Sequence, residues 1–191
     1  MSMDAVEELV IPDAAAWRTW LDEHEDESDG VWLVLAKKGT SEPTRLTYAE
    51  ALEEALCSGW IDGRKQSRDA ATFRQHFTPR RRRSIWSLRN VGLVGELIAA
   101  GRMRERGHTE IALAQEDGRW DRAYGGSAAI EVPEDLRDAL EKSPAAASAF
   151  AALNRSERYS VLFAVTTAVE GPRREATIRA QVARLEASTG E

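Results

Sequence analysis

The sequence predicts an α+β fold, with a small antiparallel sheet packed with helices and followed by an all-helical C-terminal module. Three observations predict it: an apolar strand-like run at 31–38, two more strand-like segments that follow it, and a purely helical pattern after residue 126. With 191 residues the chain can bury a core without metal or disulfide staples. We therefore expect an α+β domain over 1–126 and a helical module over 127–191.

Capping residues and periodicity define the elements of the first half. Residues 13–24 form a helix, with Asp13 as its N-cap and apolar residues at a spacing of three to four. Residues 31–38 form a strand buried on both faces, because apolar side chains occupy both alternating sets. A T-x-x-E capping box at Thr47 begins another helix, which ends at Gly59.

Two strands and the remaining helices follow. Residues 60–66 and 72–78 form a hairpin beside the first strand, and in its second strand Phe73 and Phe77 point away from the side that carries His76. Beyond the hairpin, Ser87 caps a helix that Gly101 closes, a shorter helix covers 109–116, and 118–132 is irregular. Three proline positions that suit first helical turns mark the C-terminal helices, at about 134–142, 144–153, 156–169 and 172–188.

Charge is strongly segregated along the chain. The net charge of −6 combines −11 over residues 1–63, +9 over 64–106 and −4 over 107–191. The middle segment is a basic island centred on Arg80–Arg83. Either acidic segments neutralise it within the fold, or part of it lines a site for an anion. The acidic total disfavours a nucleic-acid duplex and favours a small anionic ligand or an acidic protein surface as partner.

Several chemistries lack their sequence signatures. No phosphate loop, dinucleotide fingerprint, zinc-protease motif or nucleophile elbow occurs, and the three histidines lie on different elements. The single cysteine, Cys57, excludes an internal disulfide, and its place at the C-terminal end of a helix near Glu53 and Glu54 raises its pKa. We expect no metal site and no cofactor. With no signal peptide and no apolar run of membrane-spanning length, we expect a cytoplasmic protein without a membrane span.

Two segments concentrate unusual residues, Ala55–Lys65 and Phe77–Asn90. The period of two in a strand places Trp60, Asp62 and Arg64 on one side. The second segment brings arginines to a strand-to-helix transition, where a capped helix start offers N–H groups to an anion. The candidate ligand-binding residues are Lys38, Trp60, Asp62, Arg64, Arg80, Arg81, Ser84, Trp86, Ser87 and Asn90.

Each candidate has an expected role. Arg80 and Arg81 pair with the anion, while Ser84 and Ser87 donate hydrogen bonds to it. Asp62 orients Arg64 or Lys38. The indoles of Trp60 and Trp86 form the walls of the site. The structural alternative is that the indoles are core, that Asp62 only pairs with an arginine, and that the other arginines are solvated.

The chain carries an ordered set of motifs: W-x-x-W-L at Trp17, the strand ending in two lysines, ALCSGWIDG, TPRR with SIWSLRN, GRM at Gly101, and DGRW ending at Trp120. This set resembles the YdeI/OmpD-associated, or bacteriocin-protection, family. The C-terminal region resembles the family's terminal helical module, although Ala168–Glu170 stand where that module usually carries a lysine. The resemblance implies a link to stress resistance, to protection against antimicrobial peptides and to an outer-membrane porin.

Three functions remain open from the sequence. The first is a non-catalytic protein that holds a small anion or an acidic partner at a basic pocket. The second is a hydrolase-like or other enzyme in which Asp62 acts as a general base beside an arginine clamp. The third is a nucleic-acid binder that uses Arg80–Arg83.

Overall fold

The computed structural model describes residues 8–188. The chain divides into two compact units, one formed by Met1–Ser84 with Gly92–Glu116 and the other by Ile85–Val91 with Asp117–Glu191. Each unit is described by itself. The division falls at Glu116 and assigns a short earlier segment to the second unit, while the domain boundary after residue 126 stays a prediction.

The first unit is built on a four-stranded sheet in the order β1-β2-β4-β3. Its strands are β1 (Glu8–Leu9), β2 (Val31–Ala36), β3 (Trp60–Ser67) and β4 (Thr72–Pro79). The predicted hairpin is confirmed, since β3 and β4 are antiparallel and β4 also pairs with β2. The sequence pattern did not reveal β1, which pairs in parallel with β2 and makes the sheet mixed, because two residues are too few to show a period.

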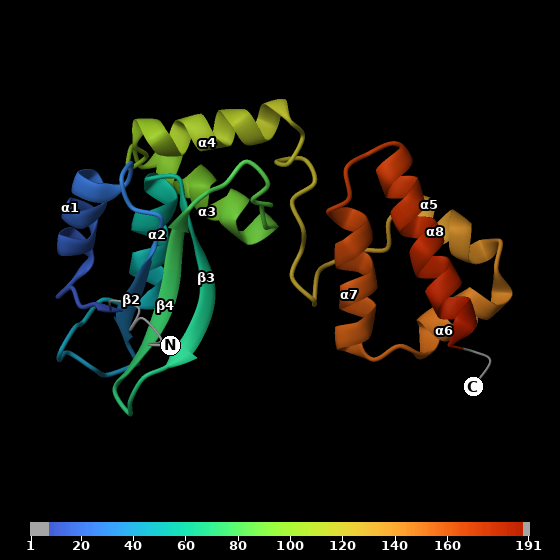
Figure 1. The fold of residues 1–191 in the computed structure, drawn as a ribbon, viewed down its shortest axis with the longest axis horizontal. Helices are drawn as coiled ribbons and strands as arrows, with labels where there is room; N and C mark the ends of the chain where they lie inside the picture. The colour runs from blue at the N-terminus through green and yellow to red at the C-terminus, as the bar shows by residue number, and fades with distance from the viewer. Residues whose placement is uncertain (1–7, 189–191) are drawn as a thin grey trace, which may run out of the picture. The chain divides into compact units, whose positions relative to one another are not determined.

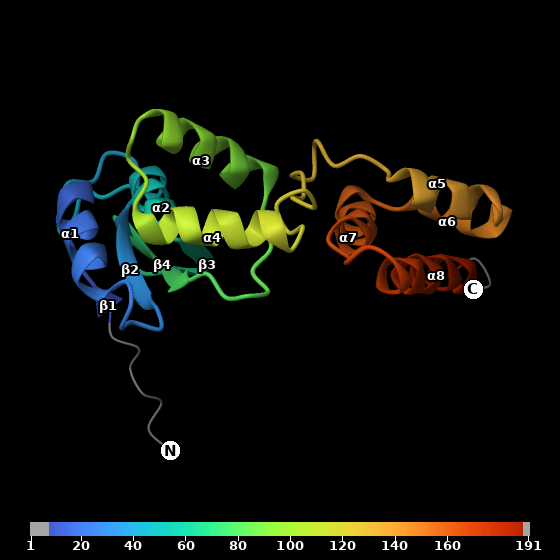
Figure 2. The ribbon, with the colours of Figure 1, turned by 90° about the horizontal axis from the view of Figure 1, so that it is seen from above.

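Helices cover one face of this sheet. Figures 1 and 2 show α1 (Ala14–His24) and α2 (Tyr48–Cys57) on the same side of the strands. Asp13 and Thr47 cap these two helices as predicted, Thr47 with its full capping box. The buried face of the sheet carries Leu33, Leu35, Phe73, Phe77 and Trp60. The opposite face carries no helix of this unit within the described residues, and it bears the polar side of β4.

A bulge interrupts β3. Asp62 lies opposite Phe77, but Lys65 lies opposite Gln75, so two residues of β3, Gly63 and Arg64, face one residue of β4, His76. One extra residue shifts the alternation of side chains by one position. Lys65, not Arg64, therefore continues the face of Trp60 and Asp62, and its ammonium lies 4.1 Å from the centre of the Phe73 ring. The expectation that Arg64 shares a side with Asp62 is wrong for this reason.

Two helices follow the sheet in the chain, α3 (Leu88–Ala99) and α4 (Glu105–Glu116). Ser87 caps α3 as predicted, because its hydroxyl oxygen accepts the N–H of Asn90 at 3.2 Å. Helix α4 begins four residues before the predicted start. Its first turn, Glu105–His108, is polar apart from Gly107 and shows no apolar period, so the pattern did not extend the helix there.

The second unit is helical, as predicted for the C-terminal region. It contains α5 (Glu134–Glu141), α6 (Pro144–Ala152), α7 (Arg155–Thr166) and α8 (Pro172–Ala187). Their apolar faces form one core of Leu136, Leu140, Ala146, Phe150, Val161, Leu162, Val165, Ile178 and Leu185. Four helices supply this core, and the segment before them is irregular as expected.

Candidate functional site

The ten predicted site residues are divided between the two units. Seven lie in the first unit: Lys38, Trp60, Asp62, Arg64, Arg80, Arg81 and Ser84. Trp86, Ser87 and Asn90 lie in the second. The candidate site therefore consists of residues of the first unit, and the other three belong to the packing of the second unit.

Trp60 belongs to the core of the first unit. Its ring has no exposed surface and meets Trp17 and Trp20 edge-on, at centroid distances of 6.4 and 5.9 Å. Its indole N–H donates to the carbonyl oxygen of Glu25 at 3.3 Å. A ring enclosed in this way offers no face to a ligand, so Trp60 does not serve as a wall of an open site.

Asp62 has a different partner from the expected one. The hydroxyl of Tyr48, at the start of α2, donates to its carboxylate at 2.9 Å. Within residues 8–188, Asp62 forms no ion pair with Arg64 or Lys38. The bulge explains the first difference, because it turns Arg64 away from the face of Asp62.

Trp86, Ser87 and Asn90 pack within the second unit. The Trp86 indole is buried and its ring centre lies 4.8 Å from that of Trp120. The carbonyl of Trp86 accepts the N–H of Tyr124 at 3.0 Å, so this segment is tied to the irregular chain that precedes α5. A buried Trp86 is core, and the Ser87 hydroxyl oxygen already serves as the helix cap.

Five of the twelve basic residues of the island are neutralised by acidic side chains, as the first interpretation of the charge pattern predicted. Arg68 and Arg74 bind Glu8, at 2.9 and 2.7 Å. Arg106 pairs with Asp26 in the acidic loop. Arg102 and Arg104 converge on a buried carboxylate described next. Most of these acids come from residues 1–63, so the −11 segment folds against part of the +9 segment.

Glu54 is the centre of this neutralisation and was not singled out by the sequence. Its buried carboxylate receives Arg18 at 2.6 Å, Arg102 at 2.7 Å and Arg104 at 3.4 Å. Burial alone would raise the pKa of Glu54, but hydrogen bonds from Arg18 and Arg102 outweigh it and lower the pKa. In the sequence, Glu54 could have been recognised as a buried charged residue because it lies on the apolar side of the predicted helix.

Burial and the charge of Glu54 raise the pKa of the neighbouring Cys57 thiol, which confirms the expected direction. The expected cause was the helix terminus and the nearby acids; burial is the larger cause. A buried thiol with a raised pKa is a poor nucleophile. Cys57 is therefore part of the packing between α2 and its neighbours.

Four arginines of the island remain without an acidic partner among the described residues: Arg64, Arg81, Arg82 and Arg83. The last three sit in a tight turn after β4, where the N–H of Arg81 donates to the Ser84 hydroxyl oxygen at 2.8 Å and the Ser84 N–H donates back to the Arg81 carbonyl at 2.7 Å. Arg81 is exposed, whereas Arg80 is buried and donates its N–H to the carbonyl of Gly59. Arg81 is thus the accessible member of the predicted pair.

His76 lies on the helix-free face of the sheet, opposite the bulge of β3 that carries Gly63 and Arg64. Its ring is 4.9 Å from that of Trp32, its partner across β2 and β4. Burial, and then the charges of Arg64 and Arg81, lower the pKa of His76 below its ordinary value of 6.5. Sequence reasoning placed His76 on this polar side of β4 but assigned it no role.

Two glycines border the His76 ring. A Cβ on Gly63 would lie 3.7 Å from Nδ1, and a Cβ on Gly30 would lie 3.3 Å from Nε2 and only 2.7 Å from the Thr78 methyl. Gly30 also has φ of +137°, a conformation that favours glycine. The backbone of these two glycines therefore lies close to the two nitrogen-bearing edges of the ring. We call His76, Arg64 and Arg81 the His76 site.

Other groups add little chemistry around this site. Trp32 is only 6% exposed, because the Arg74 guanidinium and the His76 ring lie over it. Lys38 is exposed in the turn after β2.

No group of three or more His, Cys, Asp or Glu side chains within residues 8–188 could hold a metal ion. No helix in the described part of the chain is long and apolar enough to cross a membrane.

Comparison with known families places both halves of the chain. Residues 9–110 match a family model described as a domain of unknown function, DUF8412, and this match spans more than half of the chain. The chain belongs to this family. Residues 129–188 match a second model, described as bacteriocin-protection, YdeI or OmpD-associated, which confirms the resemblance. No curated protein and no solved structure matches the chain.

The YdeI/OmpD-associated match is confined to the C-terminal helices. The motifs that suggested it, from Trp17 to Trp120, lie before residue 129 and mostly within the DUF8412 match. Of the residues that suggested the resemblance, those of the C-terminal region at 168–179 lie within the YdeI/OmpD-associated match, whereas the earlier motifs lie mostly within the neighbouring one. The His76 site lies entirely within the DUF8412 match.

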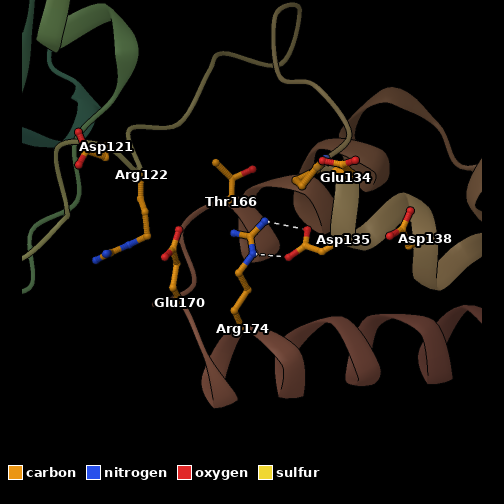
Figure 3. A pocket seen from close by; sticks show the side chains of 9 residues that line it. Asp121, Arg122, Glu134, Asp135, Asp138, Thr166, Glu170 and Arg174 are labelled. Carbon is orange, nitrogen blue, oxygen red and sulfur yellow. Dashed lines mark hydrogen bonds and ion pairs between the residues drawn. The ribbon is translucent and has the colours of Figure 1, made fainter.

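The second unit, which includes the YdeI/OmpD-associated match, contains a hollow of about 540 Å³, shown in Figure 3. Arg174 at the start of α8 binds Asp135 of α5 through two hydrogen bonds of 2.5 and 2.9 Å and also donates to the carbonyl of Val165. This arginine holds three helices together. The hollow is lined by Asp121, Arg122, Pro133, Glu134, Asp135, Asp138, Thr166, Glu170 and Arg174.

Proposed function

We propose that the DUF8412 region binds a small anion at the His76 site, on the helix-free face of its sheet. The observation that carries the proposal is the pair of arginines without acidic partners, Arg64 and Arg81, whose charges both act on one half-buried histidine. Folding neutralises several neighbouring arginines of the island but leaves these two, as well as Arg82 and Arg83, without an acidic partner among the described residues. Unneutralised guanidinium groups around a half-buried ring favour a carboxylate or phosphate ligand.

Binding by this site is non-catalytic in the proposal. The alternative enzyme would use Asp62 as a general base. The Asp62 carboxylate accepts a hydrogen bond from Tyr48 and lies on the helix-covered face, whereas His76 lies on the other one. An Asp62→Asn variant is therefore expected to leave the affinity for the anion unchanged, whereas a base acting on a bound substrate would change it.

The first test is a calorimetric titration of the full chain with inorganic phosphate at low salt. Arg64→Ala and Arg81→Ala should each weaken binding by about tenfold, because each removes one charge-assisted contact of about 1.5 kcal/mol. Their helix content by circular dichroism should stay at the wild-type level, since neither side chain supports a helix. Arg173→Ala, an exposed arginine at the start of α8, is the matched control and should bind as the wild type.

The outcomes separate the candidate functions. Wild-type affinity in both site variants would refute the His76 site. A single-stranded or duplex oligonucleotide that binds more tightly than phosphate, with log affinity falling by about 0.7 to 0.9 per contacted phosphate as log salt rises, would instead support the nucleic-acid binder with Arg80–Arg83. An affinity for phosphate without such a steep slope supports the small-anion site.

We also propose, in more general terms, that the protein has a role in resistance to antimicrobial peptides. This proposal rests on the description of the family model that residues 129–188 match. Its test is the survival of bacteriocin-treated cells that express the full chain or a chain ended before residue 129. Equal survival of both would argue against it. The phosphate titration is independent of this result.

A further inference from the structure

We propose that the anion taken by the His76 site is a phosphomonoester dianion, and that His76 takes up a proton when the dianion binds. This inference rests on the proposed anion site and specifies its ligand and its dependence on pH. The His76 ring would thus be the third donor of the site, beside the two guanidinium groups.

The charge of the site selects the class of anion. Arg64 and Arg81 are charged at every physiological pH and neither has an acidic partner within residues 8–188. A carboxylate would balance one of these two charges, whereas a phosphomonoester dianion balances both. Its three terminal oxygens can also meet donors that approach from different elements: the bulge of β3, the turn after β4, and β4 itself.

The geometry leaves His76 available as a donor. Neither ring nitrogen forms a hydrogen bond with another residue between 8 and 188, although the ring is half-buried. Gly63 and Gly30 border the two nitrogen-bearing edges, and a methyl group at Gly30 would come within 3.3 Å of Nε2. A neutral imidazole can carry its proton on either nitrogen, so it can present a donor to an oxyanion.

The charged groups around the His76 ring determine how its protonation changes when an anion binds. On β3 the bulge places Arg64 opposite it, and the charge of Arg81, in the turn after β4, also acts on it. Across β2 it meets the uncharged Trp32. Along its own strand, Arg74 is bound by Glu8 of β1, so this pair adds little net charge.

One acid lies close along the chain: Asp29, exposed and next to Gly30 in the loop before β2. Positive charges therefore dominate around the unliganded ring and disfavour its protonation. A dianion between the two guanidinium groups offsets their field, and protonation of His76 then becomes favourable. Binding must tighten as pH falls if this linkage operates.

The test follows the three histidine C2–H signals by NMR while pH is varied between about 5 and 8. Sulfate is the probe, since it keeps two charges throughout this range. Saturating sulfate should raise the pKa of His76, and it should leave the C2–H signals of the other two histidines where they were. By calorimetry, sulfate should bind up to about tenfold more tightly for each pH unit lost within the titration range of His76.

Two comparisons complete the experiment. In His76→Gln the affinity for sulfate should no longer vary with pH, whereas His108→Gln, on exposed α4, should keep the wild-type dependence. At neutral pH, phenyl phosphate should bind on the order of tenfold more tightly than benzoate, which carries the same ring and a single charge.

The possible failures are distinguishable. If no anion binds at any pH, the proposed anion site itself is refuted. If sulfate binds but the pKa of His76 does not move, or benzoate equals phenyl phosphate, the site stands and this further inference is overturned. The wild-type NMR titration decides the matter even if His76→Gln fails to fold.

Discussion

At the scale of single residues, an arginine of the basic island is neutralised only where folding brings an acidic side chain against it. Arg102 and Arg104 looked, in the sequence, like further members of a basic island, but a buried glutamate binds both. Arg64 and Arg81 came from the same island and met none. The sequence could show the excess of charge but not its distribution, because that depends on contacts between residues about 50 positions apart.

Glu54 should be the most sensitive charged residue of the first unit. Glu54→Gln leaves the partner arginines without their shared carboxylate and should lower the free energy of unfolding by about 2–3 kcal/mol. The loss stays below that of a fully buried pair, since Arg18 is 51% exposed and can be rehydrated.

Glu53→Gln is the matched control for this prediction. Glu53 is the preceding residue, its side chain is 35% exposed, and Arg102 is its one ion-pair partner within residues 8–188. Its substitution should cost less than about 1 kcal/mol. Urea denaturation followed by circular dichroism measures both variants, and equal losses would show that the Glu54 cluster has no special weight.

At the scale of elements, patterns that depend on neighbours in the chain were predictable and those that depend on partner strands were not. The capping boxes, the hairpin and the C-terminal helices all follow from local spacing. The bulge between Asp62 and Lys65 does not, because it depends on the register with β4. This one residue moved Arg64 from the side of Asp62 and changed which residues could form a site. Likewise, the sequence alone does not distinguish a tryptophan that lines a binding site from one in the hydrophobic core, and Trp60 lies in the core.

The approach of α4 to the end of α2 depends on Gly107. A Cβ at this position would lie 2.2 Å from the carbonyl oxygen of Cys57, so Gly107→Ala should force the two helices apart and destabilise the protein by about 1–3 kcal/mol. Gly95→Ala is the control, because a Cβ there would meet no atom within 4 Å.

In the interior of α3, the Gly95→Ala substitution should stabilise the helix by about 0.5–1 kcal/mol, since alanine loses less conformational entropy than glycine. The two variants should thus shift the thermal midpoint in opposite directions. A midpoint that falls equally in both would mean that the close approach at Gly107 is not what limits substitution.

At the scale of the whole molecule, both units depend on carboxylates whose pKa values are lowered by folding. In the first unit these include Glu8, through hydrogen bonds from Arg68, and Glu54. In the second they include Asp117 and Asp135. The acidic surplus of the chain therefore does more than keep it anionic: part of it is bound to arginines in the folded state and released on unfolding.

This coupling predicts the acid stability of the molecule. Each such carboxylate binds a proton more readily in the unfolded chain, with ordinary pKa values of 3.8 for Asp and 4.5 for Glu. Their contribution is fully present above those values and is lost as pH falls through the lower pKa values of the folded state. Since the pKa of His76 is also lowered, its unfolded form takes up a proton first, and stability should begin to fall near pH 6.5.

Urea denaturation between about pH 7 and pH 3 measures this loss. The slope of the free energy of unfolding against pH is proportional to the number of protons taken up on unfolding. Asp135→Asn should reduce the slope at the acidic end, since a hydrogen bond from Arg174 is the main cause of the lowered pKa of Asp135. Asp138→Asn, one turn along α5 and with no basic partner among the described residues, should leave the slope unchanged. A stability that stays constant down to pH 3 would show that these ion pairs form equally in the unfolded chain, and that the arginine network does not hold either unit together.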